Sequence, residues 1–140
     1  MTRTQARLGI GAGLVALAVV LVFAASTLAG PRPSSAVEIV VKFSKFQPDH
    51  VVVPVGVPVT ITLRNDDPID HEWIVGDEAV HAVHRVGTEP LHPDRPTEVI
   101  LPAMSSKTTV VTFDQAGTLQ FICHLPGHES YGMKGTLTIR

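Results

Sequence analysis

Apolar and polar residues alternate along most of the chain after residue 36, which is the pattern of half-buried β-strands. Val59, Ile61 and Leu63, for example, are each followed by a polar residue, and the turn-forming cluster 65–68 comes directly after them. No long segment repeats with the period of an amphipathic helix. The pattern predicts about eight short strands, over residues 37–43, 51–53, 59–63, 71–75, 97–101, 107–113, 117–123 and 135–140.

This spacing predicts an all-β domain over residues 36–140, built as a Greek-key sandwich of two antiparallel sheets. Side chains two positions apart share one face of a strand. Phe121 and Cys123 therefore share a face, as do His71 and Trp73. We expect both rows to point into the core, with one sulfur and one imidazole at their ends.

The segment before the domain has a different character. Arg3 and Arg7 precede an uncharged, mostly apolar run over residues 8–30. A positive flank before such a run predicts a hydrophobic helix that is either a signal peptide or a membrane anchor, with the domain exported. We assign residues 1–30 to this segment and 31–35 to a Pro/Ser linker, and we expect an extracytoplasmic protein, anchored if residues 8–30 are retained.

The composition excludes some functions and structural features. The chain has a formal net charge of −2, and nothing in it suggests the basic face that nucleic acid requires. It holds one cysteine, so an intramolecular disulfide is excluded. It also holds seven histidines, which makes metal binding the chemistry to examine.

The single cysteine opens a loop of metal-binding side chains between two predicted strands. Cys123 is followed five residues later by His128, and Met133 follows five residues after that. Taken singly, each has a simpler interpretation as a buried thiol, a solvated imidazole or a core filler. Their joint occurrence favours a site in which a thiolate, two imidazoles and a weak axial thioether bind copper for electron transfer. His71 is the best-placed second imidazole.

On Cys123, His128, Met133 and the Asn/Asp-rich turn that leads into His71, the chain resembles the cupredoxins, the small blue-copper proteins that include plastocyanin and azurin. The loop spacing is most similar to that of rusticyanin. The resemblance covers about the last 105 residues and implies one type 1 copper ion with His71, Cys123, His128 and Met133 as ligands. It departs from the family at Glu72, where Asn or Ser often follows the first histidine.

The remaining histidines have no assigned role at this stage. His81 and His84 have the spacing of a helical turn, and a second metal site with His92 is conceivable. We interpret this insert instead as a solvated loop and expect one copper ion. His124 should point away from the face of Cys123, as a packing or hydrogen-bonding residue.

The predicted function is to carry one electron between redox partner proteins, with the N-terminal segment as the contact to the membrane. A protein of copper tolerance or copper delivery is the alternative, because of the histidine-bearing insert. We do not expect an enzyme: the chain has no His-x-His pair, from which multicopper oxidases build a trinuclear centre.

Overall fold

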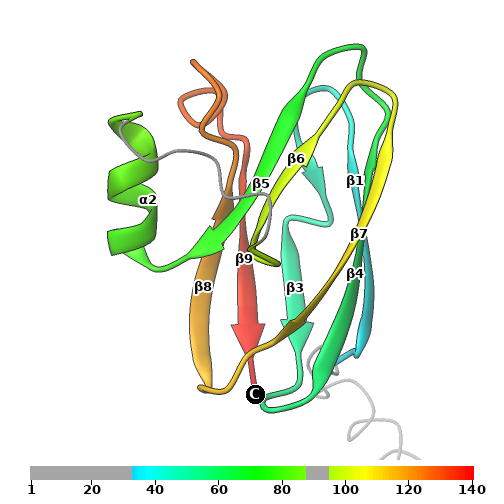
Figure 1. Cartoon of the computed structure of the whole chain (residues 1–140), viewed down its shortest axis with the longest axis vertical. Helices are drawn as coiled ribbons and strands as arrows, with labels where there is room; N and C mark the ends of the chain where they lie inside the picture. Colours follow the sequence, from blue (N-terminus) through cyan, green and yellow to red (C-terminus); the bar gives the residue numbers. More distant parts are fainter. Residues whose placement is uncertain (1–32, 88–94) are drawn as a thin grey trace, which may run out of the picture. The chain divides into compact units, whose positions relative to one another are not determined.

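The computed structural model describes residues 33–87 and 95–140, which form one β-rich unit (Figure 1). The predicted N-terminal helix of residues 8–30 and His92 of the insert lie outside the described residues. Within the part of the chain that is described, no helix is long and apolar enough to span a membrane.

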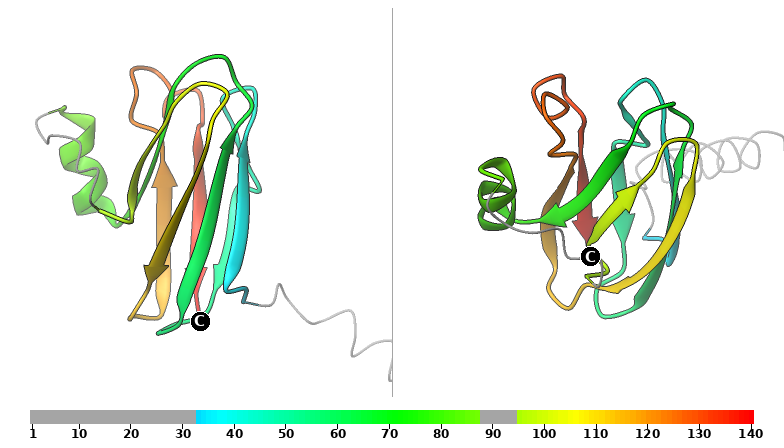
Figure 2. Two further views of the ribbon diagram at one scale, coloured as in Figure 1. Left: turned by 45° about the vertical axis from the view of Figure 1, so that its right-hand side comes forward. Right: turned by 45° about the horizontal axis from the view of Figure 1, so that its top comes forward.

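Two sheets pack face to face, as the alternating pattern predicts (Figures 1 and 2). The four-stranded sheet has the order β2–β1–β4–β7, and the five-stranded sheet has the order β3–β9–β8–β5–β6. The strands are β1 (Ala36–Val41), β2 (Phe46–Gln47), β3 (His50–Val53), β4 (Pro58–Asn65), β5 (His71–Gly76), β6 (Glu98–Leu101), β7 (Ser106–Thr112), β8 (Gly117–Ile122) and β9 (Lys134–Ile139). The predicted sandwich of two sheets is therefore confirmed.

Both sheets are mixed, so the prediction of purely antiparallel sheets is wrong. Strand β1 runs parallel to β4, and β3 runs parallel to β9. The chain leaves the four-stranded sheet after β2 and joins the other sheet at β3, beside the last strand of the fold. Alternation reports which face a side chain occupies but not the direction of the neighbouring strand, so the sequence pattern does not contain this information.

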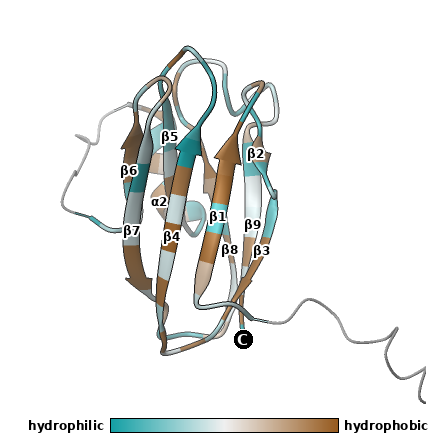
Figure 3. Cartoon of the chain, turned by 90° about the vertical axis from the view of Figure 1, so that its right-hand side faces the viewer, coloured by the Kyte–Doolittle hydropathy of each residue, from teal (hydrophilic) through white to brown (hydrophobic). Residues whose placement is uncertain are grey.

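The side chains between the sheets form a single apolar core. Figure 3 shows hydrophobic positions as brown bands along the strands. Trp73 and Phe121 are fully buried at the centre of the core, with ring centroids 6.3 Å apart. Cys123 and Met133 are also fully buried members of this core. Both rows predicted to point inward do so.

A short helix, α2 (Glu78–Arg85), follows β5 where a solvated loop was predicted, and that prediction is wrong for these residues. The Asp77 side chain caps the helix by accepting a hydrogen bond of 3.1 Å from the Val80 N–H. The helix covers the outer face of β5 and β8 (Figure 1), where Ile74 and Ile122 are fully buried although they point away from the central core. A helix of eight residues is too short to give a recognisable helical period in the sequence.

The loop that leads into β5 is fixed by one buried amide. Asn65 donates hydrogen bonds to the backbone carbonyls of Ile69, Leu101 and Pro102, at 2.8, 3.2 and 2.9 Å. Its side-chain oxygen accepts one of 2.9 Å from the Asp67 N–H. A single side chain therefore ties the turn before β5 to the loop after β6, and this sets the position of the first residue of β5.

We predict that Gly135→Ala destabilises the fold. Gly135 lies opposite Phe121 across β8 and β9, and a Cβ atom there would lie 2.2 Å from the Phe121 ring and 2.6 Å from the Asp49 carbonyl oxygen. Overpacking of this kind lowers the free energy of unfolding by about 1–3 kcal/mol, measurable by urea denaturation of the apoprotein. The matched control is Thr118→Ala at an exposed position of β8. Equal stability of the two variants would contradict the packing described for this strand pair.

Candidate metal centre

Three metal-binding side chains from separate parts of the chain meet at one end of the sandwich. His71 is the first residue of β5, Cys123 directly follows β8, and His128 lies in the loop between β8 and β9. One donor atom from each lies within 4.8 Å of the others, and they are the only such group of three or more among the described residues. The structure thus brings together three of the four residues that the sequence predicts as ligands.

The donor atoms face one another closely. Nδ1 of His71 lies 3.2 Å from Nδ1 of His128, and Cys123 Sγ lies 3.3 Å from the same His128 nitrogen. Two imidazole nitrogens and one thiol sulfur form a donor set that suits copper. His71 and Cys123 are fully buried, whereas His128 is partly exposed.

Met133 is the fourth predicted ligand, and the structure places it at the end of the same loop. Its side chain is fully buried. Its N–H donates a 3.0 Å hydrogen bond to the His128 carbonyl, and its carbonyl accepts one of 3.2 Å from the Cys123 N–H. The backbone therefore holds the methionine beside both loop residues, at the first step into β9.

The loop itself is closed by tight backbone turns. His128 N–H donates to the Leu125 carbonyl at 3.0 Å, and Gly132 N–H donates to the Glu129 carbonyl at 2.9 Å. Gly132 has a φ of 83°, in the left-handed region that glycine adopts without strain. These turns fold the segment between Cys123 and Met133 back on itself, which brings its side chains to one place.

Backbone N–H groups surround the sulfur. The Glu72 N–H donates to Cys123 Sγ at 3.3 Å, and the Leu125 N–H donates to it as well. Burial nevertheless raises the pKa of the Cys123 thiol, because the charged form loses its water. The thiol is therefore protonated in the absence of a metal, and binding of a metal by the thiolate must release a proton.

Asp67 orients the His71 ring, a role that the sequence analysis missed. The Asp67 carboxylate lies 3.1 Å from His71 Nε2 and also accepts hydrogen bonds of 2.7 Å from the N–H groups of Phe43 and Ser44. An acceptor at Nε2 places the ring proton there and leaves Nδ1 free for a metal. The sequence did offer a signal for this role, because an acidic residue lies four positions before His71. The segment that contains it was interpreted only as a turn.

The charges at this pair favour neutral imidazole beside a carboxylate. Burial lowers the pKa of His71, and the hydrogen bond to Asp67 opposes that shift only partly. Burial raises the pKa of Asp67, but the hydrogen bonds from Ser44, Phe43 and His71 outweigh it, so the pKa is lowered. His71 is thus ready to donate a lone pair without first losing a proton.

Glu72 is buried rather than exposed. Its side chain lies on the opposite face of β5 from His71 and Trp73, as its place on an alternating strand predicts, and it accepts a hydrogen bond from the His124 N–H. Burial raises the pKa of its carboxyl group. Glu72 therefore links β5 to the residue after Cys123 through both its backbone and its side chain.

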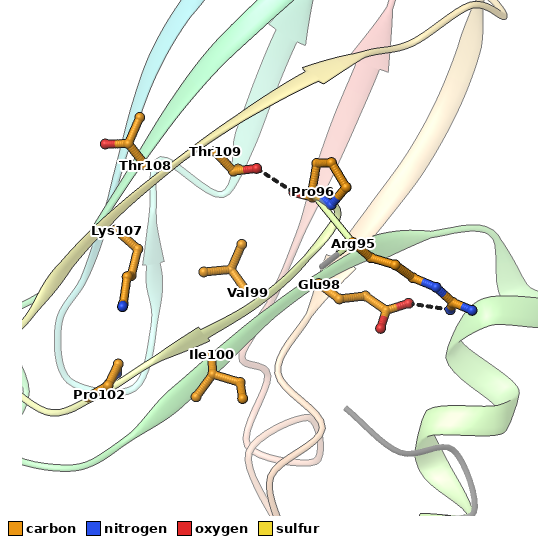
Figure 4. Close-up of a pocket in the computed structure, with 9 residues that line it drawn as sticks. All are labelled: Arg95, Pro96, Glu98, Val99, Ile100, Pro102, Lys107, Thr108 and Thr109. Atoms are coloured by element: carbon orange, nitrogen blue, oxygen red, sulfur yellow. Dashed lines mark hydrogen bonds and ion pairs between the residues drawn. The ribbon is translucent and has the colours of Figure 1, made fainter. Parts of the chain in front are cut away.

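A separate groove runs between the edge strands of the two sheets (Figure 4). It has a volume of about 500 Å³. Thr109 Oγ1 donates to the Pro96 carbonyl at 2.8 Å across its end, and Arg95 pairs with Glu98 at 2.7 Å. None of the four predicted ligands lines this groove, so it is not part of the metal centre.

Comparison with known proteins agrees with this geometry. Copper-resistant cuproprotein CopI of Pseudomonas aeruginosa is 27% identical over 142 aligned positions, covering 78% of this chain and 78% of the relative. The structure of reduced auracyanin from Roseiflexus castenholzii has a TM-score of 0.66 and 26% identity, covering 78% of this chain and 99% of that one. Auracyanin A of Chloroflexus aurantiacus, a "blue" copper protein, has a TM-score of 0.60 and 25% identity, covering 78% of this chain and all of the other.

The family is decided by a match that spans nearly the whole chain. The sequence model of the cupredoxin-like domain matches residues 13–139, which include every described strand and all four predicted ligands. The sandwich, the buried cysteine at the end of β8 and the two facing imidazoles agree with that match. The chain belongs to the cupredoxin-like family.

Proposed function

We propose that the chain binds one type 1 copper ion through His71, Cys123, His128 and Met133 and carries single electrons. The observation that supports this most directly is the convergence of two imidazoles and the only thiol within 4.8 Å in a cupredoxin-like domain. Copper, when bound, supplies a one-electron couple between its monovalent and divalent states. The likeness to auracyanin A, named as a blue copper protein, supports the same proposal.

The protein's own contribution is to hold the donors still. The Asp67 carboxylate fixes the His71 ring. The Cys123 sulfur accepts hydrogen bonds from the N–H groups of Glu72 and Leu125, and backbone hydrogen bonds hold Met133 in place. Groups held this way on strands and tight turns need little movement when the charge of the site changes. Of the four proposed ligands, only His128 is partly exposed at the surface. We therefore propose that electrons enter and leave at its exposed edge, where a redox partner protein docks.

Copper tolerance is a second candidate, favoured by the likeness to copper-resistant cuproprotein CopI. Both roles require the same donors, and they differ in what happens to the metal. An electron carrier keeps its ion through many turnovers, whereas a tolerance or delivery protein takes ions up and releases them. Neither role makes the protein an enzyme, and we propose that it is not one.

We further propose that the protein works outside the cytoplasm, as a membrane-anchored or secreted domain. The support is the apolar run of residues 8–30 behind Arg3 and Arg7. Fractionation of native cells tests this proposal: full-length protein in the cytosol would contradict it.

Copper(II)-loaded protein should show an intense visible band from thiolate-to-copper charge transfer, and Cys123→Ser should abolish it. The reason is that Cys123 is the only thiol in the chain. The melting temperature of the apo variant, compared with the apo parent, checks that the fold survives. A coloured Cys123→Ser protein would show that the sulfur is not a ligand.

Substitution of Met133 should shift the reduction potential while the colour remains. Met133→Leu removes a weak donor to copper(II) and should raise the potential, and Met133→Gln should lower it. Voltammetry measures both, with Met104→Leu as the matched control because Met104 is 70% exposed. If both Met133 variants keep the parent potential, Met133 is not the axial ligand.

Asp67→Asn should raise the reduction potential, because a buried negative charge next to His71 stabilises copper(II) more than copper(I). A difference of about 1 kcal/mol corresponds to roughly 40 mV for one electron. The control is Asp66→Asn, which removes the ion pair with Arg64 but no contact to His71. An unchanged potential for Asp67→Asn would rule out this electrostatic role.

Asp67 should also make apoprotein stability depend on pH. Its pKa is lowered in the folded state, so its stabilising effect is present above the ordinary carboxyl range and is lost as the pH falls through the folded pKa. Apo Asp67→Asn should therefore melt below the parent at pH 7 and approach it in acid. A gap that stays constant with pH would contradict the assignment.

A further inference from the structure

Helix α2 contacts the loop of residues 123–133, here called the copper loop, at two points (Figure 1). His81 of the helix is fully buried, and its Nδ1 lies 3.0 Å from Nε2 of His124, the residue directly after the cysteine ligand. At the end of the helix, the Arg85 guanidinium binds the carboxylate of Glu129, the residue directly after the loop histidine. The two contacts therefore hold the chain at both ends of the segment that joins these two proposed ligands.

The first contact is an ordinary hydrogen bond between two imidazole rings. Burial lowers the pKa of His81, so its ring is uncharged at neutral pH. His81 Nε2 lies 3.3 Å from the Gln120 carbonyl oxygen, which can only accept, and this places the N–H of His81 at Nε2. His81 Nδ1 therefore accepts the N–H of His124 Nε2. The His84 ring also stacks on His124, with centroids 5.6 Å apart, so two residues of α2 hold this side chain.

The second contact has the geometry of a directed ion pair. Arg85 Nε lies 3.0 Å from each Glu129 carboxylate oxygen, and Arg85 Nη2 lies 2.8 Å from one of them. A planar guanidinium that binds a carboxylate through two nitrogens fixes its direction as well as its distance. Arg85 also pairs with Glu78 at the start of the same helix. Because the side chains of Arg85 and Glu129 are 35% and 28% exposed, the pair adds little to overall stability, and its main effect is on position.

The helix that carries both contacts is itself fixed to the sheet. Asp77 caps its first turn by accepting a hydrogen bond of 3.1 Å from the Val80 N–H. Gly76, the last residue of β5, packs so closely on the helix that a Cβ atom there would lie 2.5 Å from the Val80 Cβ. Strand β5 begins with His71, so the helix is anchored to the strand that carries the first histidine. Helix α2 therefore links this strand to the copper loop from outside the core.

The position of His128 is the one that such a link affects most. His71 and Cys123 are fully buried, whereas His128 is partly exposed and lies in the loop between two strands. Its N–H donates to the Leu125 carbonyl at 3.0 Å, a bond inside the loop that does not tie the loop to either sheet. A bound ion can leave only when a donor moves away from it, and the donor at the surface has the most room to move. Arg85 binds the residue next to that donor.

We propose that α2 clamps the copper loop, and that Arg85 is a positioning residue that holds His128 in place through Glu129. The inference rests on the proposed ligand set and concerns how long the ion stays. With the ion pair intact, His128 keeps its place and copper is released slowly, as an electron carrier requires. With the ion pair broken, the loop opens beside Glu129 and copper is released faster, as a delivery protein requires.

Amide hydrogen exchange of the full-length apoprotein tests the clamp without any metal. In Arg85→Gln, the His128 N–H should exchange about three- to fivefold faster than in the parent, the effect expected from the loss of one partly exposed ion pair. The Thr136 N–H, which donates to the Asp49 carbonyl outside the loop at 2.7 Å, should keep its rate. A His128 rate equal to that of the parent overturns the proposal. Equal acceleration of both amides also overturns it, because the variant then only lowers the stability of the whole fold.

Release of copper(II) from the loaded protein to excess EDTA, followed by loss of the visible band, gives the second test. Arg85→Gln should keep the band and release copper about three- to fivefold faster. Glu129→Gln should match it, and the double variant should release copper no faster than either, because both substitutions break one pair. Arg64→Gln, which removes an ion pair with Glu38 away from the loop, is the matched control and should keep the parent rate. Additive effects in the double variant overturn the clamp. A parent that binds no copper would contradict the ligand set, and the exchange rates of the apoprotein would still decide whether Arg85 holds the loop.

Discussion

The pairing of β5 with β8 is the constraint on which the site depends. It sets Ile74 opposite Ile122 and thereby brings the start of β5 beside the residue that follows β8. The Glu72 N–H then reaches the Cys123 sulfur at 3.3 Å, and His71 arrives next to it with its Nδ1 facing the loop. A shift of one residue in this register would turn His71 to the opposite face of the sheet.

The same burial that shapes the site also keeps its donor groups uncharged in the absence of a metal. The Cys123 thiol and the His71 imidazole are both fully buried, and burial disfavours the charged form of each. A thiolate in this position needs a cation for compensation, which links metal affinity to pH and to the stability of the fold. The metal centre is thus part of the core and not an addition to its surface.

The sequence was sufficient for the parts of the structure that depend on face and spacing. Alternation placed Cys123 and Trp73 inside, and the intervals from Cys123 to His128 and Met133 marked one loop. The parallel pairs β1–β4 and β3–β9 were not predictable, because the alternation of apolar and polar residues is the same in parallel and antiparallel strands. Helix α2 was too short for its period to show, and the histidines on it were therefore interpreted as solvated.

Helix α2 adds a layer of packed histidines, His81, His84 and His124, on the outer face of the five-stranded sheet. The residues on either side of the sheet are covalent neighbours: Cys123 faces the core and His124 faces α2.

In the proposed site, a buried thiolate and two imidazoles bind one copper ion, with a short copper–sulfur bond. Electron paramagnetic resonance of the copper(II)-loaded protein tests it most directly, because strong copper–thiolate bonding spreads the unpaired electron onto sulfur. We predict an unusually small copper hyperfine splitting, from one ion per chain. The large splitting of copper bound only by nitrogen and oxygen ligands, as the sole signal, would contradict it.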